Sequence, residues 1–142
     1  MNIKVPQDIG GELRLLPEGP ATAVLEKITL GKSKQQKPKA TFKYTVTEEM
    51  SGVKEGEPST IGETVLETYS LQEQSMWKIN GTFKEVTGER IPQGDFNEED
   101  FEAMLNEKLT GSEWTLMLEQ KVPEDGSSTE PRTTVMSKVL TS

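Results

Sequence analysis

The sequence of 142 residues contains no cysteine and no histidine. Without cysteine there is no disulfide, no thiolate nucleophile and no metal site built on thiolates. Without histidine there is no Ser-His-Asp triad and no imidazole that acts as a base or a ligand. A metal would need oxygen ligands alone. We therefore expect neither a cofactor nor a metal site.

Long apolar runs are also missing. No stretch of about 18 apolar residues is present, and the segment Met1 to Pro6 lacks the apolar core of a signal peptide. We expect a cytoplasmic protein that does not enter a membrane. Only 32% of the residues are apolar, but they occur in patterned blocks, and the length fits one domain. We expect an N-terminal arm over residues 1–18 and one domain over residues 19–142.

Positive charge is scarce overall and concentrated in one place. The net charge is −8, which argues against a general affinity for nucleic acid. Between residues 27 and 43, however, there are six lysines and no acidic residue, so this window carries +6 and the remainder carries −14. The six are Lys27, Lys32, Lys34, Lys37, Lys39 and Lys43. The simplest alternative is a solvated loop whose lysines prevent edge-to-edge aggregation.

Hydrophobic periodicity predicts strands and helices in a definite order. We expect strands at 21–30, 40–47, 61–71, 114–122 and 133–140, with helices at 72–85 and 98–109 between the third and fourth strands. The first strand changes parity between Leu25 and Ile28, which indicates a bulge or a strong bend. The second alternates most clearly, with Phe42, Tyr44 and Val46 on one face. Asn97 is a good N-cap for the second helix.

The element order β-β-β-α-α-β-β is that of a mainly β protein, a five-stranded OB-fold barrel with a helical insertion. A small α+β sandwich with an open sheet shares this order and remains an alternative. In an OB fold the ligand crosses strands two and three, between the loops that join strands one to two and four to five. The lysine window occupies the first of those loops and its flanking strands. The residues expected to face inward are Phe42, Tyr44, Val46, Val65, Leu116, Leu118 and Val135.

Several short motifs resemble a known family. They are Leu-Pro-Glu-Gly at 16–19, Gly-Lys-Ser-Lys at 31–34, Phe-Lys-Tyr-Thr-Val at 42–46, Gly-Asp-Phe-Asn at 94–97 and Leu-Thr-Gly at 109–111. Together they resemble the single-stranded DNA-binding proteins of bacteriophage replication modules, a group that includes many domains of unknown function. The resemblance implies an OB fold and sequence-tolerant binding of single-stranded DNA during phage replication or recombination in the host cytoplasm. It also implies replication or recombination proteins as partners.

Single strands are held by cations along the backbone and by aromatic rings that stack on bases, at about 1–3 kcal/mol per base. The six lysines of the window are the candidate cations, and Lys43 shares the polar face of its strand with Thr41 and Thr45. The candidate aromatic contacts are Tyr44, Tyr69 and Trp77.

Other functions remain open at this point. Glu119-Gln120-Lys121 has the E-x-K spacing of metal-dependent nucleases, with Asp95 or Asp100 as a partner acid. Such patterns arise by chance in charged strands, so we do not expect an enzyme. A non-enzymatic phage accessory or assembly protein that acts through protein–protein contacts is the main alternative. An exposed strand edge could also pair two copies into a homodimer.

Overall fold

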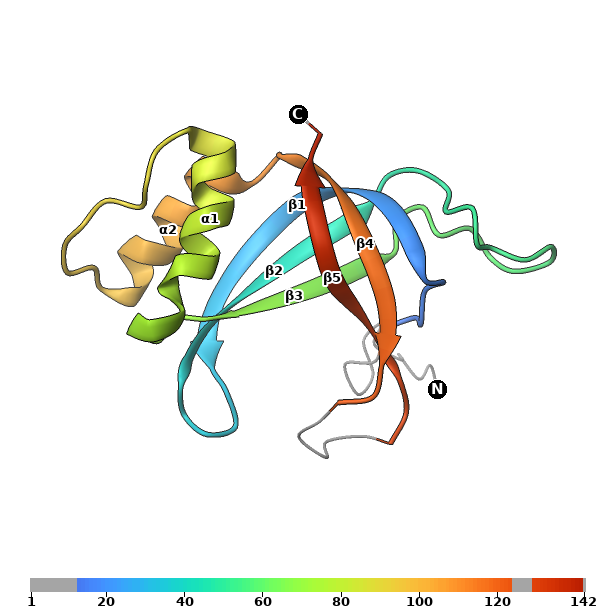
Figure 1. The fold of residues 1–142 in the computed structure, drawn as a ribbon, viewed down its shortest axis with the longest axis horizontal. Helices are drawn as coiled ribbons and strands as arrows, with labels where there is room; N and C mark the ends of the chain where they lie inside the picture. The colour runs from blue at the N-terminus through green and yellow to red at the C-terminus, as the bar shows by residue number, and fades with distance from the viewer. Residues whose placement is uncertain (1–12, 124–128, 142) are drawn as a thin grey trace, which may run out of the picture.

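The computed structural model describes residues 13–123 and 129–141. Its strands and helices follow the predicted order (Figure 1). They are β1 (Gly19–Lys32), β2 (Pro38–Val46), β3 (Thr64–Ser70), the short 3₁₀ helix η2 (Glu73–Ser75), α1 (Met76–Thr87), α2 (Glu98–Leu109), β4 (Glu113–Lys121) and β5 (Arg132–Leu140). The protein is therefore mainly β, with a helical insertion between β3 and β4, as the periodicity predicts.

The strands form one antiparallel sheet in the order β3-β2-β1-β4-β5. The long strand β1 lies at its centre: residues 19–24 pair with β4 and residues 23–32 pair with β2. The register shifts between Leu25 and Lys27, which confirms the predicted bulge. A bulge increases twist and bends its strand. Because β1 bends, its first half can pair with β4 and its second half with β2.

Side-chain alternation in β2 also matches the prediction. Ala40, Phe42, Tyr44 and Val46 are buried, and the intervening residues lie at the surface. Strand β3 begins later than predicted, since Ile61 lies in a turn before the strand and is 55% exposed. Glu67 shares the inward parity of Val65 and Tyr69, and its carboxylate accepts a hydrogen bond from the Tyr44 hydroxyl.

The described part of the N-terminal arm is attached to the domain through Leu16. Leu16 is fully buried, whereas Leu13 and Leu15 are 48% and 41% exposed. Residues 1–12 of the arm lie outside the described residues. The Leu16 amide donates to the Thr133 hydroxyl at 2.9 Å, so this part of the arm crosses the start of β5.

The helices cover one end of the sheet (Figure 1). The Asn97 side chain accepts a hydrogen bond from the Asp100 amide at 2.8 Å, which confirms the predicted N-cap of α2. Helix α2 then protects the edge of β1 that continues beyond β4. Asn106 bonds both the amide and the carbonyl of Ile28, and the Glu102 carboxylate accepts from the Leu30 amide. Beyond Val24 this edge of β1 no longer pairs with β4. The Asn106 and Glu102 side chains bond its backbone groups instead, because a buried backbone group needs a partner.

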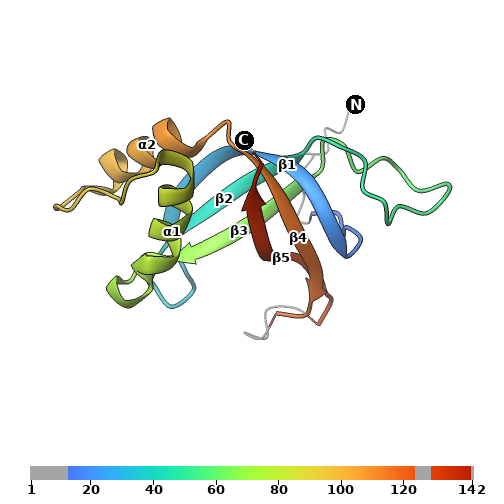
Figure 2. The same cartoon turned by 45° about the horizontal axis from the view of Figure 1, so that its top comes forward.

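The two outer strands of the sheet, β3 and β5, curl toward each other (Figures 1 and 2). No backbone pairing joins them within residues 13–123 and 129–141, so the sheet is open at this seam. Side chains bridge the seam instead. The ammonium of Lys138 from β5 forms an ion pair with the Glu67 carboxylate of β3, at 2.5 Å.

The bridge satisfies the buried lysine completely. Lys138 donates to Glu67, to the Tyr44 hydroxyl at 3.2 Å and to the Tyr69 hydroxyl, which uses the three donors of an ammonium. Its nitrogen lies 4.7–5.9 Å from the ring centroids of four aromatic residues, within cation–π range. These rings belong to Phe42, Tyr44, Tyr69 and Trp114. We call Lys138, Glu67 and these four residues the lysine cage.

The helices of the described part are too short and too polar to cross a membrane.

The lysine cage predicts how the seam responds to substitution. Glu67→Leu leaves the buried ammonium of Lys138 without its counter-ion and should lower the free energy of unfolding by about 3–5 kcal/mol. The double variant Glu67→Leu/Lys138→Met should recover most of that loss, because an apolar pair of similar size removes both charges. Urea unfolding followed by circular dichroism measures both values.

The exposed pair Lys43–Glu26, 3.7 Å apart, supplies a matched control. Its removal by Glu26→Leu should cost less than about 1 kcal/mol. If Glu67→Leu costs no more than Glu26→Leu, the cage does not hold the seam.

Candidate nucleic-acid interface

The β1–β2 hairpin carries the whole lysine window, and three of its lysines share one surface. Lys27 lies opposite Lys43 across the two strands, and Lys39 lies opposite Gly31 nearer the tip. The bulge in β1 makes the first of these pairs possible, since it shifts Lys27 onto the outer face. Lys32 ends β1, and Lys34 and Lys37 lie in the turn that follows. All six side chains are exposed or half-buried.

Hydroxyl side chains surround these cations on the outer surface of β1, β2 and β3. Thr41 pairs with Thr29 and with Thr68, and Lys39 pairs with Ser70. We call this surface the lysine–threonine face. Its members are Lys27, Thr29, Lys39, Thr41, Lys43, Thr45, Thr64, Leu66, Thr68 and Ser70. The β3 members could not be predicted as site residues, because only the register of β3 against β2 places them beside the lysines.

The hairpin tip is shorter than the gap between the predicted strands of residues 21–30 and 40–47. The turn spans residues 33–37, and Lys39 belongs to β2. Ser33 and Lys37 close it, with the Ser33 amide donating to the Lys37 carbonyl at 2.8 Å. Gln36 takes a left-handed φ of 61° to complete the reversal. The tip therefore presents Lys32, Lys34 and Lys37 from a defined turn.

One carboxylate adjoins the lysine–threonine face. Glu26, at the bulge, accepts a hydrogen bond from the Thr45 hydroxyl at 2.6 Å and lies 3.7 Å from the Lys43 ammonium. The Thr45 hydrogen bond and then the Lys43 charge hold the pKa of Glu26 below its usual value. Glu26 is thus ionised at neutral pH and partly neutralises Lys43. A bound phosphate would compete with Glu26 for the Lys43 ammonium.

The structure corrects the predicted role of the two tyrosines. Tyr44 is fully buried and Tyr69 is half-buried. The Tyr44 hydroxyl donates to the Glu67 carboxylate, and the Tyr69 hydroxyl accepts from the Lys138 ammonium. The Tyr69 hydroxyl also bonds the Thr82 hydroxyl of α1, 2.9 Å away. The Tyr69 ring packs against Phe42, and the Lys138 ammonium lies over both tyrosine rings. Neither ring is placed to stack on a base, because the even positions of β2 and Tyr69 of β3 point inward.

Trp77 is exposed but does not belong to the lysine–threonine face. It lies on α1, is 69% exposed, and has the Lys78 ammonium 5.5 Å from its ring centroid. Among the residues that the structure describes, the lysine–threonine face contains no aromatic side chain. The surface therefore combines cations and hydroxyls without a stacking platform.

The residues named for a metal-dependent nuclease do not form a cluster. In residues 13–123 and 129–141, no three acidic side chains come together in a way that could hold a metal ion. Glu119 lies in β4, Asp100 in the first turn of α2 and Asp95 in the loop before that helix. Glu119, Asp95 and Asp100 therefore lie on three different parts of the fold.

The cage around both tyrosines predicts a pH dependence of stability. Burial and then the Glu67 carboxylate raise the pKa of Tyr44 and of Tyr69 above the ordinary 10.0. A raised pKa stabilises the fold fully below the unfolded value, and this contribution is lost as pH rises further. Burial lowers the pKa of Lys138 below its ordinary 10.5. The contribution of Lys138 to the free energy of unfolding therefore increases with pH only up to about pH 10.5. The net stability should fall above about pH 10.5.

Since the chain has only these two tyrosines, near-ultraviolet phenolate absorbance reports on the cage alone. In a pH titration the phenolate signal should stay absent at pH 10, where free tyrosine is half ionised, and should appear together with loss of the circular dichroism signal. Half-ionisation of one phenol near pH 10 in the folded protein would contradict the cage.

No protein-family model and no curated protein matches this chain. The functional conclusion therefore depends on the arrangement of charge, hydroxyls and burial described above.

Proposed function

We propose that the protein binds single-stranded DNA without sequence preference, along the lysine–threonine face. The observation that carries this proposal is the separation of charge: the six lysines of the window lie on one hairpin, three of them on the same face, in a chain of net charge −8. Cations attract the phosphate backbone, and the surrounding acidic body repels it elsewhere. One path on the surface is thereby favoured over all others.

The fold supports the proposal through the position of this face. Element order, the curled five-stranded sheet and the helical insertion before β4 are features of OB folds, which bind single strands across strands two and three. The lysine–threonine face covers that region. The β1–β2 turn, the end of β4 and the start of β5 lie on the same side of the molecule, at the bottom of both views (Figures 1 and 2). In our proposal the sheet is an OB barrel whose seam is closed by the lysine cage.

Binding would depend mainly on phosphate contacts. Lysine ammoniums would pair with phosphates, and the Thr and Ser hydroxyls between them would donate to phosphate or sugar oxygens. These contacts do not read the bases, so the binding is sequence-tolerant. Without an aromatic platform on the face, the contribution of base stacking is small, and salt should weaken the complex strongly.

The biological role that we propose follows from the resemblance of the short motifs to phage single-stranded DNA-binding proteins. In that role the protein covers and protects exposed single strands during replication or recombination. A cationic path on an acidic protein suits this task. It would hold one strand along the path without recruiting duplex DNA.

Fluorescence anisotropy with labelled oligo-dT of about 10–20 nucleotides tests the proposal. With three or four phosphate contacts, log K should fall with log salt at a slope of roughly −2 to −3. The variant Lys27→Ser/Lys39→Ser/Lys43→Ser should weaken binding about tenfold or more and should make the slope shallower.

The control variant Lys78→Ser/Lys84→Ser/Lys108→Ser removes the same charge from the helices. It should bind oligo-dT within about twofold of the parent protein, because these lysines lie off the face. Equal losses in the two triple variants would indicate a response to net charge alone, and equal affinity for duplex would refute a single-strand site.

A further inference from the structure

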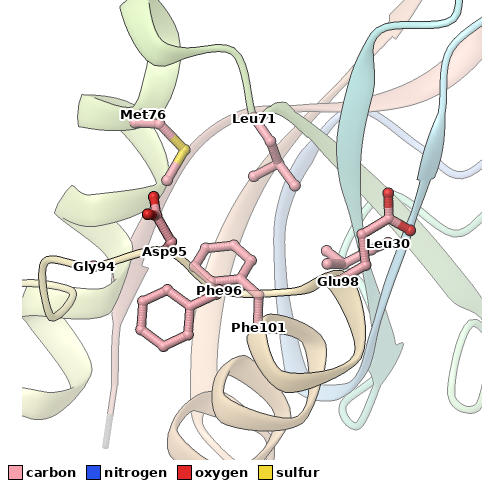
Figure 3. Close-up of a pocket in the computed structure, with 8 residues that line it drawn as sticks. All are labelled: Leu30, Leu71, Met76, Gly94, Asp95, Phe96, Glu98 and Phe101. Atoms are coloured by element: carbon pink, nitrogen blue, oxygen red, sulfur yellow. The ribbon is translucent and has the colours of Figure 1, made fainter.

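A second surface, on the helical insertion, is apolar and lies apart from the lysine–threonine face. Two adjoining pockets, of about 330 and about 770 Å³, open between α1, the loop of residues 88–97 and the start of α2. They share Met76, Gly94, Phe96 and Phe101. Figure 3 shows Met76 and Leu71 on one side of the smaller pocket, with Phe96 and Phe101 facing them. We call the two pockets together the Phe96 groove.

Large apolar side chains are exposed in this groove. Trp77 is 69% exposed and Phe96 is 40% exposed. The Phe96 ring is tilted against Phe101, with centroids 5.6 Å apart, so its position is set by packing. Exposed tryptophan and phenylalanine side chains beside a pocket are typical of the energetic centres of protein interfaces.

The loop that forms one wall is fixed by hydrogen bonds. The Ile91 amide donates to the Asn80 side chain of α1 at 2.8 Å, and Gly88 ends α1 in a left-handed conformation with φ of 78°. At the other end of the loop, Asn97 caps α2. The groove is therefore preformed, which lowers the entropic cost of binding.

Charge around the groove selects the kind of partner. Residues 73–108 contain nine acidic and four basic residues, a net charge of −5. Glu73, Asp95 and Glu98 line the groove itself, against the single cation Arg90 among the lining residues. Glu99 and Asp100 follow in the first turn of α2. An acidic rim repels a polynucleotide and attracts a cationic polypeptide.

We propose that the Phe96 groove docks a short segment of a partner protein in which one large apolar side chain is flanked by lysine or arginine. The apolar side chain fills the pocket between Met76, Phe96 and Phe101, and the flanking cations meet Glu73, Asp95 and Glu98. This inference does not depend on the proposed DNA binding. If both hold, the protein carries a nucleic-acid surface and a partner-binding surface on different elements.

A panel of labelled synthetic peptides tests the groove with the full-length protein. Each peptide has one central Leu, Ile, Phe or Tyr between Lys-Arg flanks, and anisotropy measures its affinity. At least one should bind saturably and shift the emission of Trp77, since the peptides lack tryptophan and the other tryptophan, Trp114, is fully buried. Replacing its central residue by Ser, or its cations by Glu, should reduce affinity at least about tenfold.

Phe96→Ala should reduce peptide affinity about tenfold or more, and Asp95→Asn/Glu98→Gln should reduce it severalfold. Leu66→Ala is the control, since Leu66 is 41% exposed, about as much as Phe96, but lies on the lysine–threonine face. It should leave peptide affinity within about twofold. Phe96 is exposed enough for its replacement to preserve the fold, which circular dichroism verifies.

Three outcomes would overturn this inference. One is the absence of saturable binding by every peptide of the panel at millimolar concentration. The second is equal loss in Phe96→Ala and Leu66→Ala. The third is displacement of the bound peptide by oligo-dT together with a Trp77 emission shift, which would assign the groove to the DNA path. Failure of oligo-dT binding alone would refute the proposed function and leave the groove untouched.

Discussion

The ion pair between Lys138 and Glu67 is the interaction on which the shape of this protein depends. It joins β5 to β3 across a seam that has no backbone ladder in the described part of the chain. Burying two charges is costly unless each has its partners, and here the ammonium has three acceptors and four surrounding rings. Because Tyr69 also bonds Thr82 of α1, the cage ties the helical insertion to the same seam. The cage thereby links the seam of the sheet to helix α1.

The cage also determines what remains at the surface. It holds both tyrosines, Phe42 and Trp114 in the interior, so the outer face of β1, β2 and β3 presents lysines and hydroxyls without aromatic rings. The exposed aromatics Trp77 and Phe96 lie on the helical insertion, among acidic residues. A cationic hydroxyl surface suits a phosphate backbone, and an acidic apolar groove suits a cationic peptide. We propose that this division lets the protein bind a single strand and a protein partner without competition between them.

Much of the fold can be predicted from local patterns in the sequence. Alternation in β2, the parity change in β1 and the Asn97 cap of α2 are each encoded within a few neighbouring residues, and each is confirmed. The ion pair of Glu67 could not be predicted in this way, because its partner Lys138 is 71 residues away. The same limit applies to Asn106, whose side chain serves the backbone of Ile28. For the candidate site, the lysine cluster follows from composition. The predicted contact of Tyr44 with bases conflicts with its inward parity in β2, and Tyr69 is held by contacts with Phe42 and Lys138 that no local pattern reveals.

Amide chemical-shift mapping of the isotope-labelled protein during titration with oligo-dT tests the division of surfaces most directly. Our account predicts that the shifted amides lie on the outer positions of β1, β2 and β3, with Lys39, Thr41 and Lys43 among the largest changes, while those around Phe96 stay in place. Changes confined to the helical insertion, or spread evenly over the molecule, would contradict it.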